Sequence, residues 1–378
     1  MDEGGETPFT GERTLGIEEE FYLVDDDGRP ADGTDELCYQ HEPPEILKDR
    51  LDHELFTFVI ETQTPVIESL DAAPAILTEI RSALVDYAAD HGYGIAAAGL
   101  HPTARWREHN HVDKPRYQRQ LDRIQFPQHR NITAGLHLHV GVGDAERAVW
   151  IANEIRWYLP IILAISANSP FWNGYDTGLS SARASIFESL PNTGMPTAFD
   201  DYGTYRRLEQ VLLETDSIRD RGEIWFDVRP HTEYGTVEVR TPDAQADTAV
   251  VLALAEYVYR LVEALDEGHR SVTDTDQVAS ESIHADWATP PADGDLGATH
   301  ALLSENKWRA IRYGQDASFI DRSGRTTVSF ETAVRDEIDR LDLRRLDACL
   351  SEPSGTERQR AALEAGGPSA VCDLIRLE

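Results

Sequence analysis

The stretch TLGIEEEFYLVD at residues 14–25 places three consecutive glutamates inside an apolar, β-prone run. Carboxylates are rarely buried without a partner, so this run restricts the possible folds more than any other stretch. Side chains two residues apart share one face of a strand. Glu18 and Glu20 are therefore expected on one face and Glu19 on the other. On this pattern alone, Glu19→Gln should be tolerated, whereas Glu20→Gln should abolish the function of the face.

Two carboxylates on one open sheet face repel each other. A divalent cation removes that repulsion, because hard Mg²⁺ and Mn²⁺ ions prefer oxygen ligands. The alternative is a solvated strand face that simply carries charge, which is reasonable in so acidic a chain. The sequence contains 35 basic and 68 acidic residues, for a net charge of −33.

The acidic excess is spread along the chain, and only Lys48, Lys114 and Lys307 are lysines. This composition is typical of a salt-in halophile, since molar salt shortens the Debye length to about 3 Å and weakens self-repulsion. A polyanion repels nucleic acid and anionic membranes, so neither is an expected partner. No apolar run reaches about 18 residues and no apolar signal segment is evident, which favours a cytoplasmic protein. Three cysteines without zinc-type spacing suggest neither a metal site nor a disulfide framework.

Strand and helix patterns are mixed along the chain without strict alternation. Strands are expected at 14–25, 54–67, 93–102, 131–143, 223–230 and 235–242. Helices are expected at 72–90, 144–168, 204–215, 247–268, 298–313 and through the C-terminal residues. Polar and apolar residues alternate in several strands, which favours an antiparallel sheet with one open face. We therefore expect an α+β fold, with a curved, mostly antiparallel sheet backed by helices.

Four further stretches carry residues with compatible chemistry. They are Glu61 in FVIETQTP, His137 and His139 in AGLHLHVGV, Glu238 and Arg240 in GTVEVRTP, and Lys307, Arg309 and Arg312 in ENKWRAIRYG. Each has an ordinary alternative: a core histidine, a surface ion pair or a solvated helix face. Together they offer acidic metal ligands, an imidazole, and guanidinium groups suited to phosphate.

The sequences GIEEEF, IETQTP, GLHLHVGV, ANSPFWNG, GTVEVR and ENKWRAIRYG together resemble the short branch of the glutamate–cysteine ligases, the carboxylate–amine ligase type. The resemblance runs from about residue 14 to about residue 320. It implies a fold like the catalytic domain of glutamine synthetase, in which Mg²⁺ ions lie in a funnel between ATP and the amino acid. The expected organisation is a ligase domain at 1–328 and a helical extension at 329–378 packed on the same domain.

The resemblance also implies roles for matching positions. The implied metal ligands are Glu18, Glu20, Glu54, Glu61, His137 and Glu238. Glu54 and Glu61 are seven residues apart, so a regular strand would place them on opposite faces, and a bend or bulge is expected between them. Arg240 would meet the transferred phosphate. His139 matches no position of the family with a known role, and could support a ligand, face substrate or be structural.

Contacts to nucleotide or substrate anions are less specific. The candidates are Lys307, Arg309 and Arg312, together with Arg183 in GLSSARASIF. For each of the four, a salt-bridged or solvated role is the alternative. Family members are often oligomers, so a homo-oligomer formed through the 247–268 helix is one expectation, and a buried core role for that helix is the other.

The implied reaction is ATP-dependent formation of γ-glutamylcysteine. ATP phosphorylates the γ-carboxylate of glutamate, and the amine of cysteine attacks the acyl phosphate. The protein would mainly position the reactants and neutralise charge. The chain has no G-x-x-x-x-G-K-[ST] loop, so a P-loop ATPase is disfavoured and ATP is expected to be held through its Mg²⁺ or Mn²⁺ ions. In haloarchaea the family implies this thiol as a redox buffer.

Three alternatives remain at this level. A ligase of the same fold could join another acid or amine. A metal-dependent hydrolase could use HLH with His101 or His231, but five glutamates would then be unexplained, and that motif normally lies near the N-terminus. A non-catalytic acidic binding protein would not need Glu238 and Arg240 beside the other metal-type residues. Mg²⁺-dependent ADP release separates the ligases from the other two.

Overall fold

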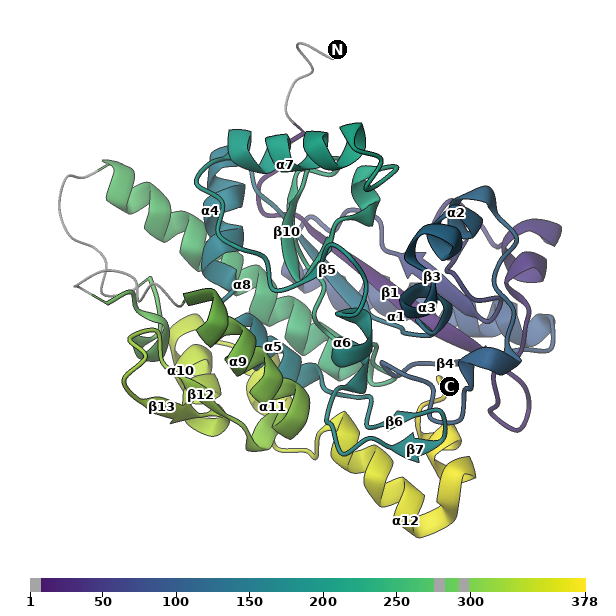
Figure 1. Cartoon of the computed structure of the whole chain (residues 1–378). Coiled ribbons are helices and arrows are strands. Elements are labelled where there is room, and N and C mark those ends of the chain that lie inside the picture. Colours follow the sequence, from purple (N-terminus) through teal and green to yellow (C-terminus); the bar gives the residue numbers. More distant parts are fainter. Residues whose placement is uncertain (1–7, 275–282, 292–298) are drawn as a thin grey trace.

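The computed structural model describes residues 8–274, 283–291 and 299–378. A sheet of seven strands forms its centre (Figure 1). The strands are β1 (Leu15–Val24), β2 (Leu51–His53), β3 (Val59–Gln63), β4 (Gly94–Ala96), β5 (Leu136–Gly141), β10 (Val228–His231) and β11 (Thr236–Val239). Their order is β10-β11-β5-β1-β3-β2, with β4 also paired to β1, and every pairing is antiparallel. The predicted α+β fold with an antiparallel sheet is confirmed.

The strand registers bring the predicted ligands onto neighbouring positions. Glu18 on β1 lies opposite His137 on β5, and Glu20 lies opposite Glu61 on β3. Glu238 on β11 lies opposite His139 on β5. Because opposite residues of adjacent strands point to the same side of the sheet, one face collects all of these side chains.

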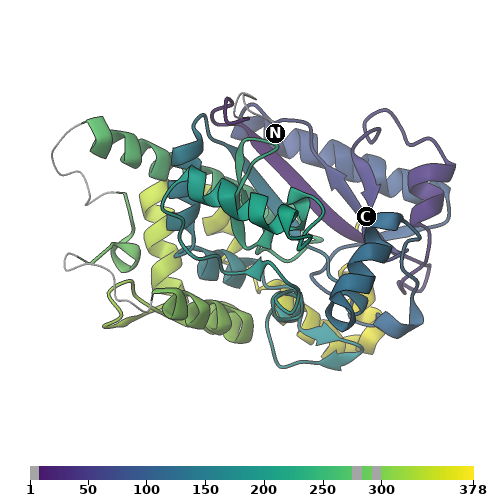
Figure 2. The same cartoon turned by 45° about the horizontal axis from the view of Figure 1, so that its top comes forward.

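Helices cover the other face of the sheet. They are α1 (Ala73–Asp90), α4 (Ala145–Ile155), α5 (Leu159–Ser166) and α8 (Thr248–Asp274). In Figure 2, α1 lies behind the purple strand β1, whereas α7 (Tyr202–Glu214) lies in front of it. Leu254, Tyr257, Val258 and Leu261 of α8 are fully buried in the same core as Leu138. The apolar face of the 247–268 helix therefore has a core role within this chain.

The segment 144–168, expected as one helix, forms two. Helices α4 and α5 meet at an angle of 65°. Pro160 lies in the first turn of α5, where its missing N–H costs nothing but a continuous helix could not form. Among the described residues no single helix is long and apolar enough to cross a membrane, and α4 and α5 reach that length and composition only as this bent pair.

The segment 54–67, expected as one extended strand, is also different. Its first residues turn the chain from β2 into β3, and the Glu54 N–H donates to the Val59 carbonyl at 2.9 Å. A hairpin turn, rather than a bulge within one strand, therefore separates Glu54 from Glu61.

Shorter elements lie around the edges of the open face. They are α2 (Pro115–Ile124), α3 (Phe126–His129), β6 (Phe171–Trp172), β7 (Tyr175–Asp176), α6 (Ala182–Phe187), β8 (Thr193–Gly194) and β9 (Trp225–Phe226). In Figure 2, α2 and α3 lie on the same side of β1 as α7. Of these segments, α2, α3, α6 and β9 contribute residues to the wall of the cavity described below.

The C-terminal part contains α9 (Thr299–Tyr313), the hairpin β12 (Ser318–Ile320) and β13 (Thr327–Ser329), α10 (Phe330–Leu341), α11 (Arg344–Cys349) and α12 (Gly355–Leu374). Helix α11 packs on α8, and α10 packs on α5 and α8. The chain end joins the sheet edge, because the Leu377 N–H donates to the Ile95 carbonyl at 2.8 Å. The domain boundary expected at residue 328 stays a prediction.

Candidate active site

A cavity of about 380 Å³ lies over the open face of the sheet. Its walls include all six predicted metal ligands and the predicted phosphate-binding arginine: Glu18, Glu20, Glu54, Glu61, His137, Glu238 and Arg240. These residues come from β1, β3, β5, β11 and the turn after β2. The fold thus brings into one space side chains that are up to 222 residues apart in the sequence (240 − 18 = 222).

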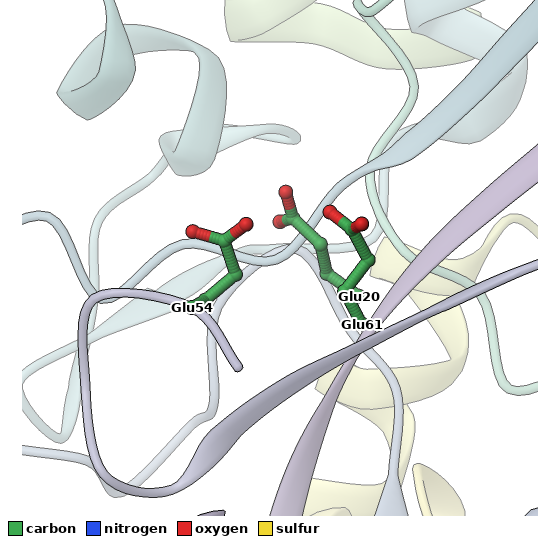
Figure 3. Close-up of side chains that lie close together, drawn as sticks. All are labelled: Glu20, Glu54 and Glu61. Atoms are coloured by element: carbon green, nitrogen blue, oxygen red, sulfur yellow. The ribbon is translucent and has the colours of Figure 1, made fainter. Parts of the chain in front are cut away.

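Three of these carboxylates form a tight group at one end of the cavity. Glu20 and Glu61 come from neighbouring strands and Glu54 from the turn, and their side chains rise toward the same space (Figure 3). One carboxylate oxygen from each lies within 4.8 Å of the other two. Burial, and then the charges of Glu20 and Glu18, raise the pKa of Glu54 to about 8. Burial and the charges of Glu18 and Glu54 raise the pKa of Glu61 well above its usual range.

The raised pKa values of Glu54 and Glu61 bear on whether these three carboxylates could bind a cation. The pKa values of Glu54 and Glu61 are raised by burial and by neighbouring carboxylates, which the positive charge nearby in the protein does not offset. A hard divalent cation supplies further positive charge and takes oxygen ligands. The donor set of Glu20, Glu54 and Glu61 therefore fits Mg²⁺ or Mn²⁺.

The second group of ligands lies beside the first, around two histidines. His137 Nδ1 is 3.1 Å from Glu18 Oε1, and His137 Nε2 is 3.8 Å from Glu20 Oε1. His139 Nε2 lies 3.4 Å from Glu18 Oε2 and 3.9 Å from Glu238 Oε1. Both Nε2 atoms are buried and have no hydrogen-bond partner in the described part of the chain. Two such nitrogens beside carboxylates fit a second cation.

His139 therefore faces the site rather than the core. Its other nitrogen, Nδ1, lies 3.0 Å from the hydroxyl of Thr236, which fixes the ring orientation. Although burial alone would raise the pKa of Glu18, His137 and His139 hold it well below the usual range. Glu18 is thus kept ionised between the two groups.

Arg240 reaches the cavity from the end of β11. Glu238 accepts hydrogen bonds from both Arg240 and Arg229. Although burial opposes it, these two guanidinium groups hold the pKa of Glu238 well below its usual range. Burial would lower the pKa of Arg240, but Glu238 and Glu18 raise it. Arg240 is consequently a permanent positive charge in the wall of the site.

Arg229 was missing from the sequence prediction. Its signal was present, because the antiparallel pairing of β10 with β11 places it opposite Glu238. The Arg229 guanidinium also donates to the carbonyls of Arg221 and Ile224. These hydrogen bonds connect the segment before β9 to the cavity face of the sheet.

Arg183 lies behind the site rather than in its wall. Its guanidinium donates to the backbone carbonyls of Thr241 and Arg240 at 3.2 and 3.4 Å, and lies 4.0 Å from the buried Asp243. It also presses close to Gly135, where an added Cβ would come within 2.1 Å of Nη2. A glycine is required there for the close approach, and its N–H donates to Glu20 at 2.6 Å.

Lys307, Arg309 and Arg312 do not reach the cavity. Lys307 is buried and its Nζ lies 2.6 Å from both Glu188 and Asp227. Arg309 donates to Glu305 at 2.9 Å and to the Ser318 carbonyl at 3.0 Å. The Arg312 guanidinium lies over the ring of the neighbouring Tyr313. These three side chains have the contacts that the salt-bridged or exposed alternative predicts, and their contact with a nucleotide stays a prediction.

The cavity wall also contains residues that the ligase interpretation of the sequence did not include. Those from α2, α3 and the following loop are Arg116, Tyr117, Gln120, Gln128, Asn131 and Thr133, and those near β9 and β10 are Phe187, Trp225, His231 and Tyr234. The proline at the start of α2 could have signalled that helix. Because α2 is distant in sequence from the acidic strands, no local pattern predicts that it lines the cavity.

Comparisons with known proteins agree with this geometry. The glutamate–cysteine ligase of Natronomonas pharaonis is 56% identical over 380 residues, covering 100% of this chain and 99% of that protein. The glutamate–cysteine ligase of Haloferax volcanii is 54% identical over 378 residues, covering 100% of both. Both relatives are haloarchaeal, in agreement with the halophilic composition.

Solved structures show the same fold at low identity. The glutamate–cysteine ligase of Francisella tularensis in complex with AMP aligns with a TM-score of 0.66 at 12% identity, covering 97% of this chain and 88% of that chain. A bifunctional glutathione synthetase from Pasteurella multocida aligns with a TM-score of 0.65 at 13% identity, covering 96% of this chain and 51% of that chain.

The family match extends further than the motifs suggested. It covers residues 14–370, whereas the motifs ended near residue 320, so most of the C-terminal helices lie inside the match. The expectation that these helices lie outside the resemblance is wrong. With this coverage and relatives above 50% identity, the chain belongs to the glutamate–cysteine ligase family 2.

Proposed function

We propose that the chain is an ATP-dependent ligase that joins the γ-carboxylate of glutamate to the amine of cysteine. The observation that carries this proposal is the single cavity in which six metal-type ligands and Arg240 meet on one sheet face. Relatives above 50% identity carry the name glutamate–cysteine ligase, which supports the same reaction.

The protein side chains divide into two candidate metal groups. Glu20, Glu54 and Glu61 would hold one Mg²⁺ or Mn²⁺ ion, and Glu18, His137 and Glu238 would hold a second. Bound in these places, the ions would neutralise phosphate charge and polarise the transferring phosphoryl group.

Arg240 would act on the phosphoryl group as it moves from ATP to glutamate. In this step the γ-carboxylate oxygen forms a bond to the γ-phosphorus, and the bond to the ADP oxygen breaks. Glu238 accepts a hydrogen bond from the Arg240 guanidinium, which orients the side chain, and the Arg240 backbone N–H donates to the Asp227 carbonyl at 2.9 Å, which holds the main chain. Oriented N–H donors stabilise negative charge without reorganisation.

The second step joins the amine to the activated carboxyl. The amine lone pair attacks the acyl carbon, the bond to phosphate breaks, and the amine loses a proton. At the α2–α3 end of the cavity, Arg116 and the amides of Gln120, Gln128 and Asn131 offer donors for the carboxylates of the two amino acids.

The hydrolase alternative loses support from the structure. His101 is fully buried, and its Nε2 lies 3.0 Å from the Gly28 carbonyl. It cannot join His137 and His139 in one metal site without leaving the core. His231, the other candidate, lies in the cavity wall with its ring 5.5 Å from that of His139, but a hydrolase site built on these histidines would leave the clustered glutamates unexplained. No observation favours this second function over the ligase.

A coupled ADP-release assay with mass detection tests the proposal. The protein would be assayed in molar KCl with Mg²⁺, ATP and glutamate, and cysteine and a panel of other amines would be offered in turn. We expect ADP release together with γ-glutamylcysteine only when cysteine is present. ADP release with a different amine would replace the acceptor, and the absence of any Mg²⁺-dependent ADP release would overturn the proposal.

A further inference from the structure

The β10–β11 hairpin carries an exposed aromatic ring at the edge of the cavity. Tyr234 is 58% exposed, although it lies in the wall of the cavity together with His231. The two rings are stacked, with centroids 4.3 Å apart and an angle of 5° between their planes. One face of the tyrosine is thus covered by His231, and the rest of the ring remains accessible.

Several contacts hold this stacked pair in place. The edge of the His139 ring packs against both partners, at 5.5 Å from His231 and 5.7 Å from Tyr234. The Tyr234 N–H donates to His231 Nδ1 at 3.3 Å. The next residue, Gly235, has a φ of +68° and lies so close to the Pro8 carbonyl that an added Cβ would be 2.1 Å from its oxygen. A ring fixed in this way loses little conformational entropy when a ligand covers it.

The position of Tyr234 in the chain indicates how a nucleotide would be oriented in the cavity. Tyr234 belongs to the four-residue turn that joins β10 to β11, and Thr236, Glu238 and Arg240 follow that turn at intervals of two residues. His139 lies between the tyrosine and Glu238, because its ring centroid is 5.7 Å from that of Tyr234 and its Nε2 is 3.9 Å from Glu238 Oε1. An extended nucleoside triphosphate can bridge the span from Tyr234 to Glu238, with its base over the tyrosine and its phosphates toward Glu238 and Arg240.

Trp225 is another aromatic side chain of the cavity wall, which also includes Tyr117 and Phe187. It is only half-exposed, and its ring packs edge-on against Phe187 at 6.4 Å. It is not on the strand that carries Glu238 and Arg240. The stacked, exposed ring of Tyr234 is therefore the better placed of the two.

We propose that Tyr234, backed by His231, is the stacking platform for the base of the nucleotide substrate. The nucleotide then lies along the β10–β11 hairpin, and the amino acids occupy the α2–α3 end. This inference rests on the proposed function, because it identifies the base-binding end of that same site. Stacking of a base on an aromatic side chain contributes about 1–3 kcal/mol.

The test compares Tyr234→Ala with Tyr234→Phe in the full chain, in molar KCl with Mg²⁺. For Tyr234→Ala we expect the KM for ATP to rise roughly tenfold or more, with the KM for glutamate near the wild-type value. Tyr234→Phe keeps the aromatic face and should retain most of the ATP affinity. Tyr175→Ala is the matched control, because Tyr175 is 74% exposed and is not part of the cavity wall.

Two inhibitors separate base binding from phosphate binding. Inhibition by AMP should weaken in Tyr234→Ala by about the same factor as the KM for ATP rises, whereas inhibition by inorganic tripolyphosphate, which has no base, should not change. Equal weakening of both inhibitors, an unchanged KM for ATP, or a comparable effect in Trp225→Ala but not in Tyr234→Ala would overturn the inference.

Direct calorimetric titration with AMP keeps this test separate from the reaction. If the wild-type protein released no ADP with any amine, the proposed function would fail, and weaker AMP binding by Tyr234→Ala would still establish the platform. If ADP release were normal and AMP binding equal in both proteins, only the platform would fail.

Discussion

The two faces of β1 carry the same residue type in opposite roles. Glu19 points toward the helices, is 4% exposed, and accepts two hydrogen bonds from Arg81 of α1, at 3.0 and 2.5 Å. Glu18 and Glu20 point into the cavity, where Glu54 and Glu61 add further carboxylates. On the packed face the charge is matched within the protein, and on the cavity face it is not.

The difference shows which carboxylates are neutralised by the protein itself and which would need a bound ion. Arg81 also donates to the Gln245 and Ala246 carbonyls and to the Thr248 hydroxyl, so the Glu19 pair locks β1 to the segment before α8. Burial and neighbouring carboxylates raise the pKa values of Glu54 and Glu61, and in the described part of the chain neither forms an ion pair like that of Glu19 with Arg81. Packing explains Glu19, whereas the group around Glu20 offers a donor set that a divalent cation would fit.

The largest expected effect comes from neutralising the cavity face. In Glu20→Gln we expect turnover to fall by roughly three orders of magnitude, equivalent to about 4 kcal/mol of transition-state stabilisation. The urea midpoint of the metal-free protein in molar KCl should stay equal or rise, because repulsion with Glu54 and Glu61 is relieved. ADP release and urea unfolding measure the two effects. Turnover within tenfold of the wild type would contradict the cation assignment.

The packed face should respond in the opposite way. Glu19→Gln leaves Arg81 buried without a full counter-charge, so the free energy of unfolding should fall by about 3 kcal/mol. Turnover per folded molecule should stay close to wild type. Strand alternation alone predicts that this variant is tolerated, and the buried ion pair corrects that expectation.

A matched surface pair provides the control for Glu19→Gln. Glu12 is about half-exposed and pairs with Arg147 and Arg270. Glu12→Gln should cost less than about 1 kcal/mol. If urea unfolding showed equal losses in the two variants, the difference between a buried and an exposed pair would fail as an explanation.

Lys307 extends the comparison to a buried cation away from the cavity. Lys307→Met leaves Asp227 buried without its partner, so we expect a loss of about 2 kcal/mol in unfolding free energy. The KM for ATP of the folded protein should remain near wild type. A large rise in the KM for ATP with unchanged stability would instead show that Lys307 contributes to nucleotide binding.

The smallest effects are expected on the outer surface of α9. Arg309→Ala removes a helix ion pair with Glu305 and should cost less than about 0.5 kcal/mol. Arg312→Ala removes only an exposed contact with Tyr313. Steady-state kinetics should show both KM values near wild type. A fall in ATP affinity in either variant would show that the two arginines contact the nucleotide.

The cavity face could be predicted from the sequence because it depends on local periodicity. Spacing by two residues placed Glu18 with Glu20 and His137 with His139, and the structure has both pairs on the same face. The turn between Glu54 and Glu61 could not be predicted, because residues 55–58 are Leu, Phe, Thr and Phe, without the usual turn residues.

Contacts between residues that are distant in sequence also could not be predicted from local patterns. Glu19 and Arg81 are 62 residues apart, and Lys307 lies 80 residues from Asp227. A helical pattern gives the face on which Lys307 lies but not the neighbour it meets. The distant partners that identify Glu19 and Lys307 as structural charges therefore became evident only in the tertiary fold.

Manganese binding tests the contrast between the two faces most directly. Mn²⁺ would be titrated into wild type, Glu20→Gln and Glu19→Gln in molar KCl, with free Mn²⁺ followed by electron paramagnetic resonance. We predict that Glu20→Gln loses about one bound ion per chain or binds it far more weakly, whereas folded Glu19→Gln binds as wild type does. Unchanged binding in Glu20→Gln, or equal loss in both folded variants, would contradict the account.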